Sequence, residues 1–217
     1  MMTEIYDFLA QLAENNDREW FQAHKETYTR LHHAFEEEVA RLIALMSEYE
    51  PDARSLTAKQ CVYRIYRDVR FSPDKSPYKR HFAACIGRGG RQCMRSCYYI
   101  HIQPNASFVG GGLWMVEPDA LARLRSLMDA DGEEFHQIIT NPDFASRYYL
   151  AGDSLKKMPK GFSENTSHPE YVKMKQFLYC KDVPNEYFTQ SQDWVAKVAE
   201  DLRHLKPAHD FVNYIFD

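Results

Sequence analysis

The sequence predicts a single α+β domain, residues 1–217, in which a central, mostly antiparallel sheet is covered by N-terminal and C-terminal helices. Apolar residues recur every three or four positions in the first fifty residues and again after Pro118, as in amphipathic helices. The stretch from about residue 60 to residue 115 instead alternates apolar and polar residues between glycines and prolines, as strands do. No repeat or low-complexity linker divides the chain, and 44% of its residues are hydrophobic, enough for one sizeable core.

The N-terminal region is expected to form two helices. The first is short, with a stripe made of Ile5, Phe8, Leu9 and Leu12. Asn15-Asn16 ends it, and Asn16 followed by Glu19 resembles a capping box with Asn in place of the usual Ser or Thr. A long helix over residues 17–46 should follow, because its apolar stripe steps by three or four positions from Trp20 to Met46.

Four strands are expected in the middle of the chain, joined as a meander: residues 61–71, 81–86, 97–103 and 107–114. In the first run, successive side chains point to opposite faces, so one face carries Arg64, Tyr66, Asp68 and Arg70. A loop with two prolines, 72–77, follows that run.

Helices return after Pro118. We expect one helix containing Leu121 to Met128, shorter helices at 135–139 and 144–149, a loop at 152–169, a strand at 177–180 and a C-terminal helix from about residue 192 to 214 with a break at Pro207. The lysines at 156, 157, 160, 173 and 175 form a weaker basic region, for which a solvated face is the default interpretation.

Charge is distributed unevenly along the chain, although the whole carries a net charge of −4. Residues 59–95 hold ten Lys or Arg against two Asp or Glu, a net charge of +8, whereas residues 1–58 carry −7 and residues 96–217 carry −5. Such concentrated positive charge meets an anion, either a ligand or the protein's own carboxylates. The basic segment is therefore the first place to look for a site.

The same segment carries a family resemblance. Residues 64–79, Arg-Ile-Tyr-Arg-Asp-Val-Arg-Phe-Ser-Pro-Asp-Lys-Ser-Pro-Tyr-Lys, resemble the family catalogued as domain of unknown function 2461. Further similar pieces follow the family's order: Asn-Asn-Asp-Arg-Glu-Trp-Phe at 15–21, Tyr-Tyr-Ile-His-Ile at 98–102, Ser-Phe-Val-Gly-Gly-Gly-Leu-Trp at 107–114 and Lys-Gly-Phe at 160–162. The resemblance implies one domain spanning nearly the whole chain and a soluble, intracellular protein, and it implies no activity.

The basic segment predicts a binding site for a small phosphate- or carboxylate-bearing ligand. Arginine offers planar, bidentate donors suited to such anions, and lysines in the following loop can close over them. The predicted ligand-binding residues are Arg64, Tyr66, Arg67, Arg70, Lys75, Lys79 and Tyr99. Tyr99 and His101 share a strand face, and if that strand pairs with the basic one, Asp68 and His101 form the one acid/base pair that turnover would use.

Two other interpretations stay open. In the first, the charges serve only the fold, with Arg64 and Arg70 paired to Asp68, Asp74 or the acidic run at 36–38. Alternatively, the strand and loop at 63–80 dock an acidic partner or RNA in a non-enzymatic module, although the net negative charge makes nucleic acid the weaker candidate. Gly110-Gly111-Gly112 permits close approach of a ligand to the backbone, and a sheet bend explains it equally well.

Known cofactor and metal motifs are not found. Cys85, Cys93 and Cys97 with His81 have loose spacing for zinc, so we expect free thiols and no metal ligands. The sequence identifies no cofactor and leaves the oligomeric state open. The odd number of five cysteines, the lack of an apolar leader and the lack of an apolar run of about 18 residues together predict a cytoplasmic protein that does not enter a membrane.

Overall fold

The computed structural model describes residues 1–217, and its centre is a five-stranded antiparallel sheet with the strand order β1-β2-β3-β5-β4. The strands are β1 (Phe82–Ile86), β2 (Cys97–Ile102), β3 (Ser107–Leu113), β4 (Tyr149–Ala151) and β5 (Phe177–Val183). Strands β1 to β3 form a meander, and β5 returns from the C-terminal half of the chain to pair with β3. The predicted α+β class with an antiparallel sheet is confirmed.

Ten α-helices and three short 3₁₀ turns accompany the sheet. The helices are α1 (Met2–Glu14), α2 (Arg18–Ala23), α3 (Lys25–Met46), α4 (Ala58–Cys61), α5 (Pro118–Thr140), α6 (Pro142–Ala145), α7 (Pro169–Val172), α8 (Glu186–Thr189), α9 (Trp194–Arg203) and α10 (Lys206–Asn213). The 3₁₀ turns are Pro51–Ser55, Gly90–Gln92 and Tyr214–Phe216. None of these helices has both the length and the apolar character needed to cross a membrane.

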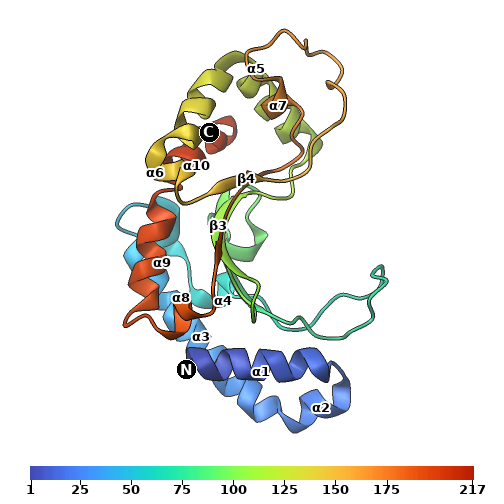
Figure 1. Ribbon diagram of the computed structural model, residues 1–217, viewed down its shortest axis with the longest axis vertical. Coiled ribbons are helices and arrows are strands. Elements are labelled where there is room, and N and C mark those ends of the chain that lie inside the picture. The colour runs from blue at the N-terminus through green and yellow to red at the C-terminus, as the bar shows by residue number, and fades with distance from the viewer.

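One face of the sheet is buried under helices from both halves of the chain (Figure 1). Phe35 of α3 packs on Phe82 of β1, and His209 of α10 stacks on Tyr98 of β2. Phe135 of α5 reaches the rings of β5 at the other end of the sheet. We call this side the core face; its residues belong to one connected cluster of 47 buried apolar residues.

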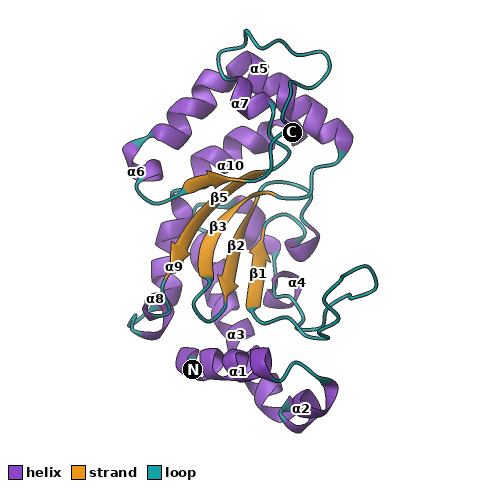
Figure 2. Cartoon of the chain, turned by 45° about the vertical axis from the view of Figure 1, so that its right-hand side comes forward, coloured by secondary structure: helices purple, strands orange, loops and turns teal.

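The opposite side of the sheet has no helix in front of it (Figure 2). On β2 the burial alternates strictly, so Tyr98, Ile100 and Ile102 are buried while Tyr99 and His101 are only partly buried. We call this side the open face; as the sequence predicted, Tyr99 and His101 of β2 share it. It is bounded at one end by the loop that precedes β1 and at the other by the α5 and α7 end of the molecule (Figures 1 and 2).

The strand expected over residues 61–71 is wrong. Backbone from Val62 to Arg67 runs antiparallel to residues 77–84, but only two isolated bridges form, Val62 with Ala84 and Tyr66 with Tyr78. The N–H of Arg67 donates to the Pro77 carbonyl, and Pro77 has no N–H with which to return the second hydrogen bond. The pairing is therefore interrupted at Arg67, and the segment beyond it projects as a loop (Figure 1).

Helix boundaries also differ from expectation at three places. The predicted helix 17–46 is interrupted at His24, and the N-cap is Asp17, whose side chain accepts a hydrogen bond from the Trp20 N–H. The helix expected at 135–139 is the end of α5, and the one expected at 144–149 shortens to α6. The C-terminal helix has the expected break, but the break lies before Lys206, so that Pro207 is in the first turn of α10, where its missing N–H is harmless.

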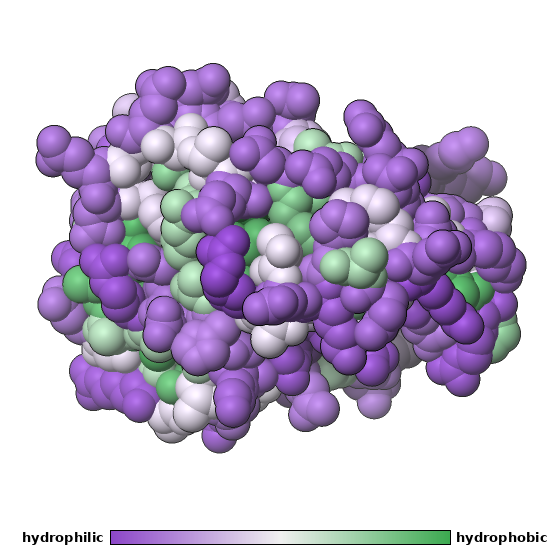
Figure 3. Space-filling view, turned by 90° about the horizontal axis from the view of Figure 1, so that it is seen from below, coloured by the Kyte–Doolittle hydropathy of each residue, from purple (hydrophilic) through white to green (hydrophobic).

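The end of the molecule that carries α1 and α2 presents mostly hydrophilic side chains, with small and scattered apolar patches (Figure 3). Single exposed apolar side chains of this kind are normal on a protein surface.

Candidate functional site

The basic segment forms an arm, residues 62–81, that joins the sheet at the free edge of β1. Its two sides are held together near the sheet by backbone hydrogen bonds from Tyr63 to Ala83 (2.9 Å) and from Lys79 to Ile65 (2.7 Å). Its base is also tied to the N-terminal region, because the Asn16 side chain makes two hydrogen bonds to the backbone of Tyr78 and Phe21 stacks on the Tyr78 ring at 4.0 Å. These contacts link two of the sequence pieces noted above.

The outer part of the arm pairs its own charges. Arg67 donates to Asp74 at 2.6 Å and to the Ser76 carbonyl at 3.0 Å. Arg70 binds both carboxylate oxygens of Asp68, through Nε at 2.9 Å and Nη2 at 2.6 Å. These pairs favour the predicted structural interpretation for this part of the arm.

The two carboxylates of the outer arm are strongly held in their ionised form. Hydrogen bonds from Arg70 lower the pKa of Asp68 to about 2. Hydrogen bonds from Ser76, followed by one from Arg67, hold the pKa of Asp74 well below its usual range. Lys75 donates to the Val69 carbonyl at 3.0 Å. Charged hydrogen bonds of this kind shape a loop but leave few free donors for a ligand.

The root of the arm is different, because none of its three cations, Arg64, Lys79 and Arg91, forms an ion pair, whereas Arg67 and Arg70 each do. Lys79 donates to the carbonyl of Arg64 at 2.7 Å and lies 5.1 Å from the centre of the Tyr63 ring. The guanidinium of Arg91 donates to the Val62 carbonyl. Burial, followed by the positive charges of Arg64 and Arg91, lowers the pKa of Lys79. Three like charges are thus held near one another without a carboxylate ion pair.

Tyr99 and His101 lie on the open face of β2, as predicted. The Tyr99 hydroxyl lies 3.4 Å from His101 Nδ1, and His101 Nε2 lies 3.1 Å from Gln103 Oε1. An amide oxygen only accepts hydrogen bonds, so His101 carries its proton on Nε2 and accepts from Tyr99 at Nδ1. Burial lowers the pKa of His101, which keeps the ring neutral.

His81 completes the group. Its ring centre lies 4.1 Å from that of His101, and Phe108 of β3 stacks on the other side of His101 at 4.8 Å. Burial, with a further contribution from the positive charge of Lys79, lowers the pKa of His81 to about 3. Ring nitrogens that stay neutral beside cations can donate to or accept from a ligand without adding repulsion.

We call this group the root cluster: Tyr63, Arg64, Lys79, His81, Arg91, Tyr99 and His101. Of the predicted site residues, the structure brings together Arg64, Lys79, Tyr99 and His101. It places Arg67, Asp68, Arg70 and Lys75 in the outer arm, and Tyr66, 45% exposed, against the rings of Phe21 and Tyr78. Sequence reasoning missed Tyr63 and Arg91 as members and considered His81 only with zinc, although alternation along β1 places His81 on the same face as Cys85.

All five cysteines are free thiols, and Cys85 and Cys97 lie beside this cluster, near Tyr63 and Tyr99. The sulfur atoms of Cys85 and Cys97 are 2.9 Å apart on the open face. Hydrogen bonds with Cys85 and Cys93, followed by burial, raise the pKa of the Cys97 thiol well above its ordinary value. A protonated thiol is a poor nucleophile and a poor metal ligand, so Cys97 contributes an apolar surface at neutral pH.

The glycine triplet on β3 serves packing. A Cβ atom on Gly111 would lie 2.7 Å from Nε2 of His209 and would also collide with the Cys97 carbonyl. Gly112 has a φ of 123°, a conformation that other residues rarely adopt. These close contacts and the positive φ support the structural interpretation of the triplet, a bend in the sheet.

Two surface hollows are prominent, and neither includes a residue of the root cluster. One, of about 420 Å³, lies between α5, α6 and the α9–α10 junction. The other, of about 450 Å³, lies at the β3 and β5 ends near Asn105 and Pro184. Both are shallow and open, so the cluster is part of an exposed sheet surface rather than the wall of either hollow.

Comparison with known proteins gives one result. The family model described as a conserved hypothetical protein (DUF2461) matches residues 4–211. No curated protein and no solved structure matches the chain. The match covers the arm, the sheet and the helices at both ends, and it agrees with the resemblance carried by residues 64–79. The chain therefore belongs to the DUF2461 family of conserved hypothetical proteins.

Proposed function

We propose that the protein binds a small anionic ligand, bearing phosphate or carboxylate, at the root cluster on the open face of the sheet. The observation that carries the proposal is the set of three neighbouring cations, Arg64, Lys79 and Arg91, none of which forms an ion pair, in a chain whose outer-arm arginines are paired. Like charges held together destabilise the ligand-free protein, and a bound anion removes that penalty.

Each residue of the cluster has a role in this proposal. Arg64 supplies planar donors for a phosphate or carboxylate, and Lys79 supplies a point charge. The neutral ring of His81 supplies hydrogen bonds, and His101 holds the Tyr99 hydroxyl in place. Tyr63 and Tyr99 supply an aromatic surface for the rest of the ligand.

The contacts favour binding over turnover. Asp68, the predicted acid/base partner of His101, is held by two hydrogen bonds from Arg70 in the outer arm. His101 has both ring nitrogens in hydrogen bonds to Tyr99 and Gln103. A general base needs a free nitrogen or oxygen within reach of the proton it removes.

Thermal unfolding with a panel of inorganic phosphate, nucleotides, phosphorylated metabolites and dicarboxylates tests the proposal. We expect a ligand at one hundred times its Kd to raise the stability of the wild-type protein by about 2.7 kcal/mol. The matched variants are Arg64→Gln at the root and Arg70→Gln in the outer arm. The first should lose the shift and the second should keep it. An equal loss in both variants, or no shift with any compound, would contradict the proposal.

A second candidate, docking of an acidic protein segment on the arm, rests on a different observation. Phe71 is 95% exposed beside Arg70, whose side chain is 77% exposed, so the arm presents a ring and a cation to solvent. An exposed surface without an enclosed hollow suits such a partner. Phe71→Ala would weaken capture of an acidic peptide while leaving phosphate binding at the root unchanged; selective capture of short RNA instead would favour a nucleic-acid partner.

A further inference from the structure

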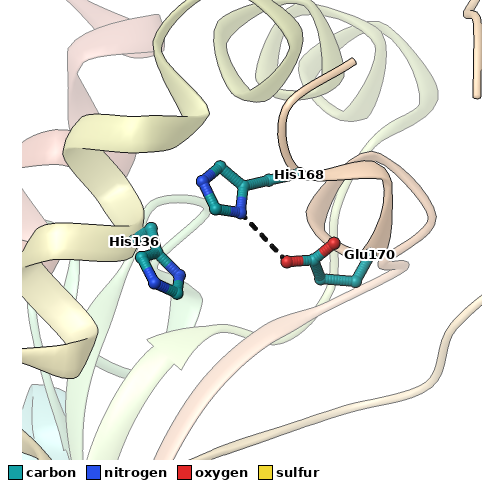
Figure 4. Close-up of side chains that lie close together, drawn as sticks. All are labelled: His136, His168 and Glu170. Carbon is teal, nitrogen blue, oxygen red and sulfur yellow. Dashed lines mark hydrogen bonds and ion pairs between the residues drawn. The ribbon is translucent and has the colours of Figure 1, made fainter. Parts of the chain in front are cut away.

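A cluster of histidine and glutamate side chains lies far along the chain from the root cluster, between α5 and α7. His136 comes from α5, His168 precedes α7 and Glu170 lies in the first turn of α7 (Figure 4). One potential ligand atom from each of these three residues lies within 4.8 Å of the other two. We propose that these three side chains bind one divalent transition-metal ion of the zinc type.

The local backbone brings the two segments together. Within α5, Asp131 departs from helical geometry, with φ −123° and ψ 24°, five residues before His136. Gly132 follows, and a Cβ atom there would lie 3.4 Å from the Cβ of His168, so the segment before α7 packs closely on the helix at this point. The break and the glycine together place the first turn of α7 beside the second half of α5.

The donor set suits zinc. Two imidazoles and one carboxylate are common ligands of zinc, with bonds of about 2.0 to 2.2 Å, and a water molecule takes the fourth position in sites with three protein ligands. Tetrahedral ligands at these distances lie about 3.3 Å apart. The three ligand atoms lie at most 4.8 Å from one another, so a movement of about 1.5 Å closes the widest possible gap, and Glu170, 57% exposed on its side-chain atoms, has room to move.

Neighbouring groups already orient the two rings. The Tyr171 hydroxyl lies 2.7 Å from His136 Nδ1, and Glu133 Oε2 lies 3.0 Å from His168 Nε2. The remaining nitrogen of His168, Nδ1, faces Glu170 Oε1 at 3.1 Å. A carboxylate on the far nitrogen of a metal-binding histidine fixes the ring and makes it a better ligand, and Glu133 is placed for that role.

Ion pairing alone explains only part of this arrangement. It accounts for His168, which lies between Glu133 and Glu170. It does not account for His136, whose ring stacks on His168 at 4.5 Å and which pairs with no carboxylate. A metal ion uses both rings, and it would fasten the long segment 152–168 to α5 at the end of that segment.

Metal binding by the intact protein tests the proposal directly. Purified protein would be stripped with a chelator and titrated with Zn²⁺ by calorimetry, and with Co²⁺ by visible absorption. We expect one ion per chain and the intense absorption of a four-coordinate cobalt site. His136→Gln and Glu170→Gln should each weaken binding at least tenfold. His33→Gln is the matched control, since His33 and Glu37 form an exposed pair on α3 with no second imidazole.

Limited digestion with trypsin adds a readout that does not depend on affinity. Zn²⁺ should slow cleavage after Lys157 and Lys160 in the wild-type protein but not in His136→Gln, and cleavage after Lys75 in the arm should be unaffected in both. Thermal unfolding of each variant without metal shows whether it has folded. Zinc affinity equal to wild type in folded His136→Gln, or no binding at about 100 µM Zn²⁺, would overturn the proposal.

Discussion

Each face of the sheet carries a histidine ring close to a second ring, but one pair is enclosed by the core and the other lies on the open face. On the core face His209 stacks on Tyr98 at 4.2 Å, and on the open face His81 lies 4.1 Å from His101. Burial lowers the pKa of both His209 and His81 to about 3. A neutral histidine therefore does not by itself mark a site, because His209, 1% exposed, is enclosed by the core.

The two faces differ in whether their cations form ion pairs. Behind the core face, buried Asp201 accepts from Lys181 at 2.7 Å and from the Tyr187 hydroxyl, and it forms an ion pair with Arg147. On the open face, Lys79 and its neighbours Arg64 and Arg91 form no ion pair. The buried Asp201 is stabilised by its partners, whereas Lys79, half-buried between two exposed arginines, is repelled by like charges and is the cation that a bound anion would stabilise most.

The largest expected effect is a loss of stability when the packing of the core face is disturbed rather than that of the open face. Gly111→Ala places a Cβ atom against His209 and the β2 backbone, and we expect it to lower the free energy of unfolding by about 3 kcal/mol. Phe108→Ala, on the same strand, removes a partly exposed ring from the open face and should cost only about 1 kcal/mol. Urea unfolding of both variants measures the difference.

The opposite ranking would show that the open face carries the greater part of the packing. It would also remove the reason to treat that face as available for a ligand.

Acid titration gives the next effect. The pKa of His209 is about 3 in the folded protein, below the 6.5 of an ordinary histidine, so the unfolded chain binds more protons between these values. This histidine therefore makes the free energy of unfolding fall as the pH drops below about 6.5, by up to about 1.4 kcal/mol per pH unit. His81 adds a smaller fall, since water partly reaches it.

Unfolding measured at several pH values between 7 and 4.5 tests this. His209→Phe should flatten the dependence on pH, and His33→Gln should leave it as in the wild type. An anion bound at the root cluster should raise the pKa of His81 and leave that of His209 unchanged, which NMR of the ring carbons can follow. A shift of both histidines would remove the distinction between the faces.

Sequence patterns predicted most of the sheet strands and the longer helices. They failed where one missing backbone N–H interrupts the pairing of two segments. Alternation placed Tyr99 and His101 on one face of β2 correctly, since a buried core face imposes the period of two. The same alternation failed for residues 61–71: Cys61 ends α4, only two isolated bridges form after it, and Pro77, opposite Arg67, lacks the N–H that would continue the pairing.

The contents of the sites were harder to predict than their location. Charge density marked the arm, but it could not show that Arg70 pairs with Asp68 while Lys79 is unpaired, since this depends on the course of the loop. The cluster at His136 and His168 gave no spacing signal, because its members are 32 residues apart and meet only through the packing of α7 on α5.

Lys79→Met gives the smallest expected change in stability and the sharpest test of the comparison. The variant loses one hydrogen bond to the Arg64 carbonyl and one contact with the Tyr63 ring, and it also loses a half-buried charge that Arg64 and Arg91 repel. These terms oppose each other, so we expect the free energy of unfolding to change by less than about 1 kcal/mol. Phosphate binding at the root should nevertheless weaken about tenfold, whereas Lys75→Met, in the outer arm, should leave both quantities unchanged. If Lys79→Met instead strongly destabilises the protein, then the root cations stabilise the fold rather than bind a ligand. They would then have the same structural role as Asp201 and its partners behind the core face.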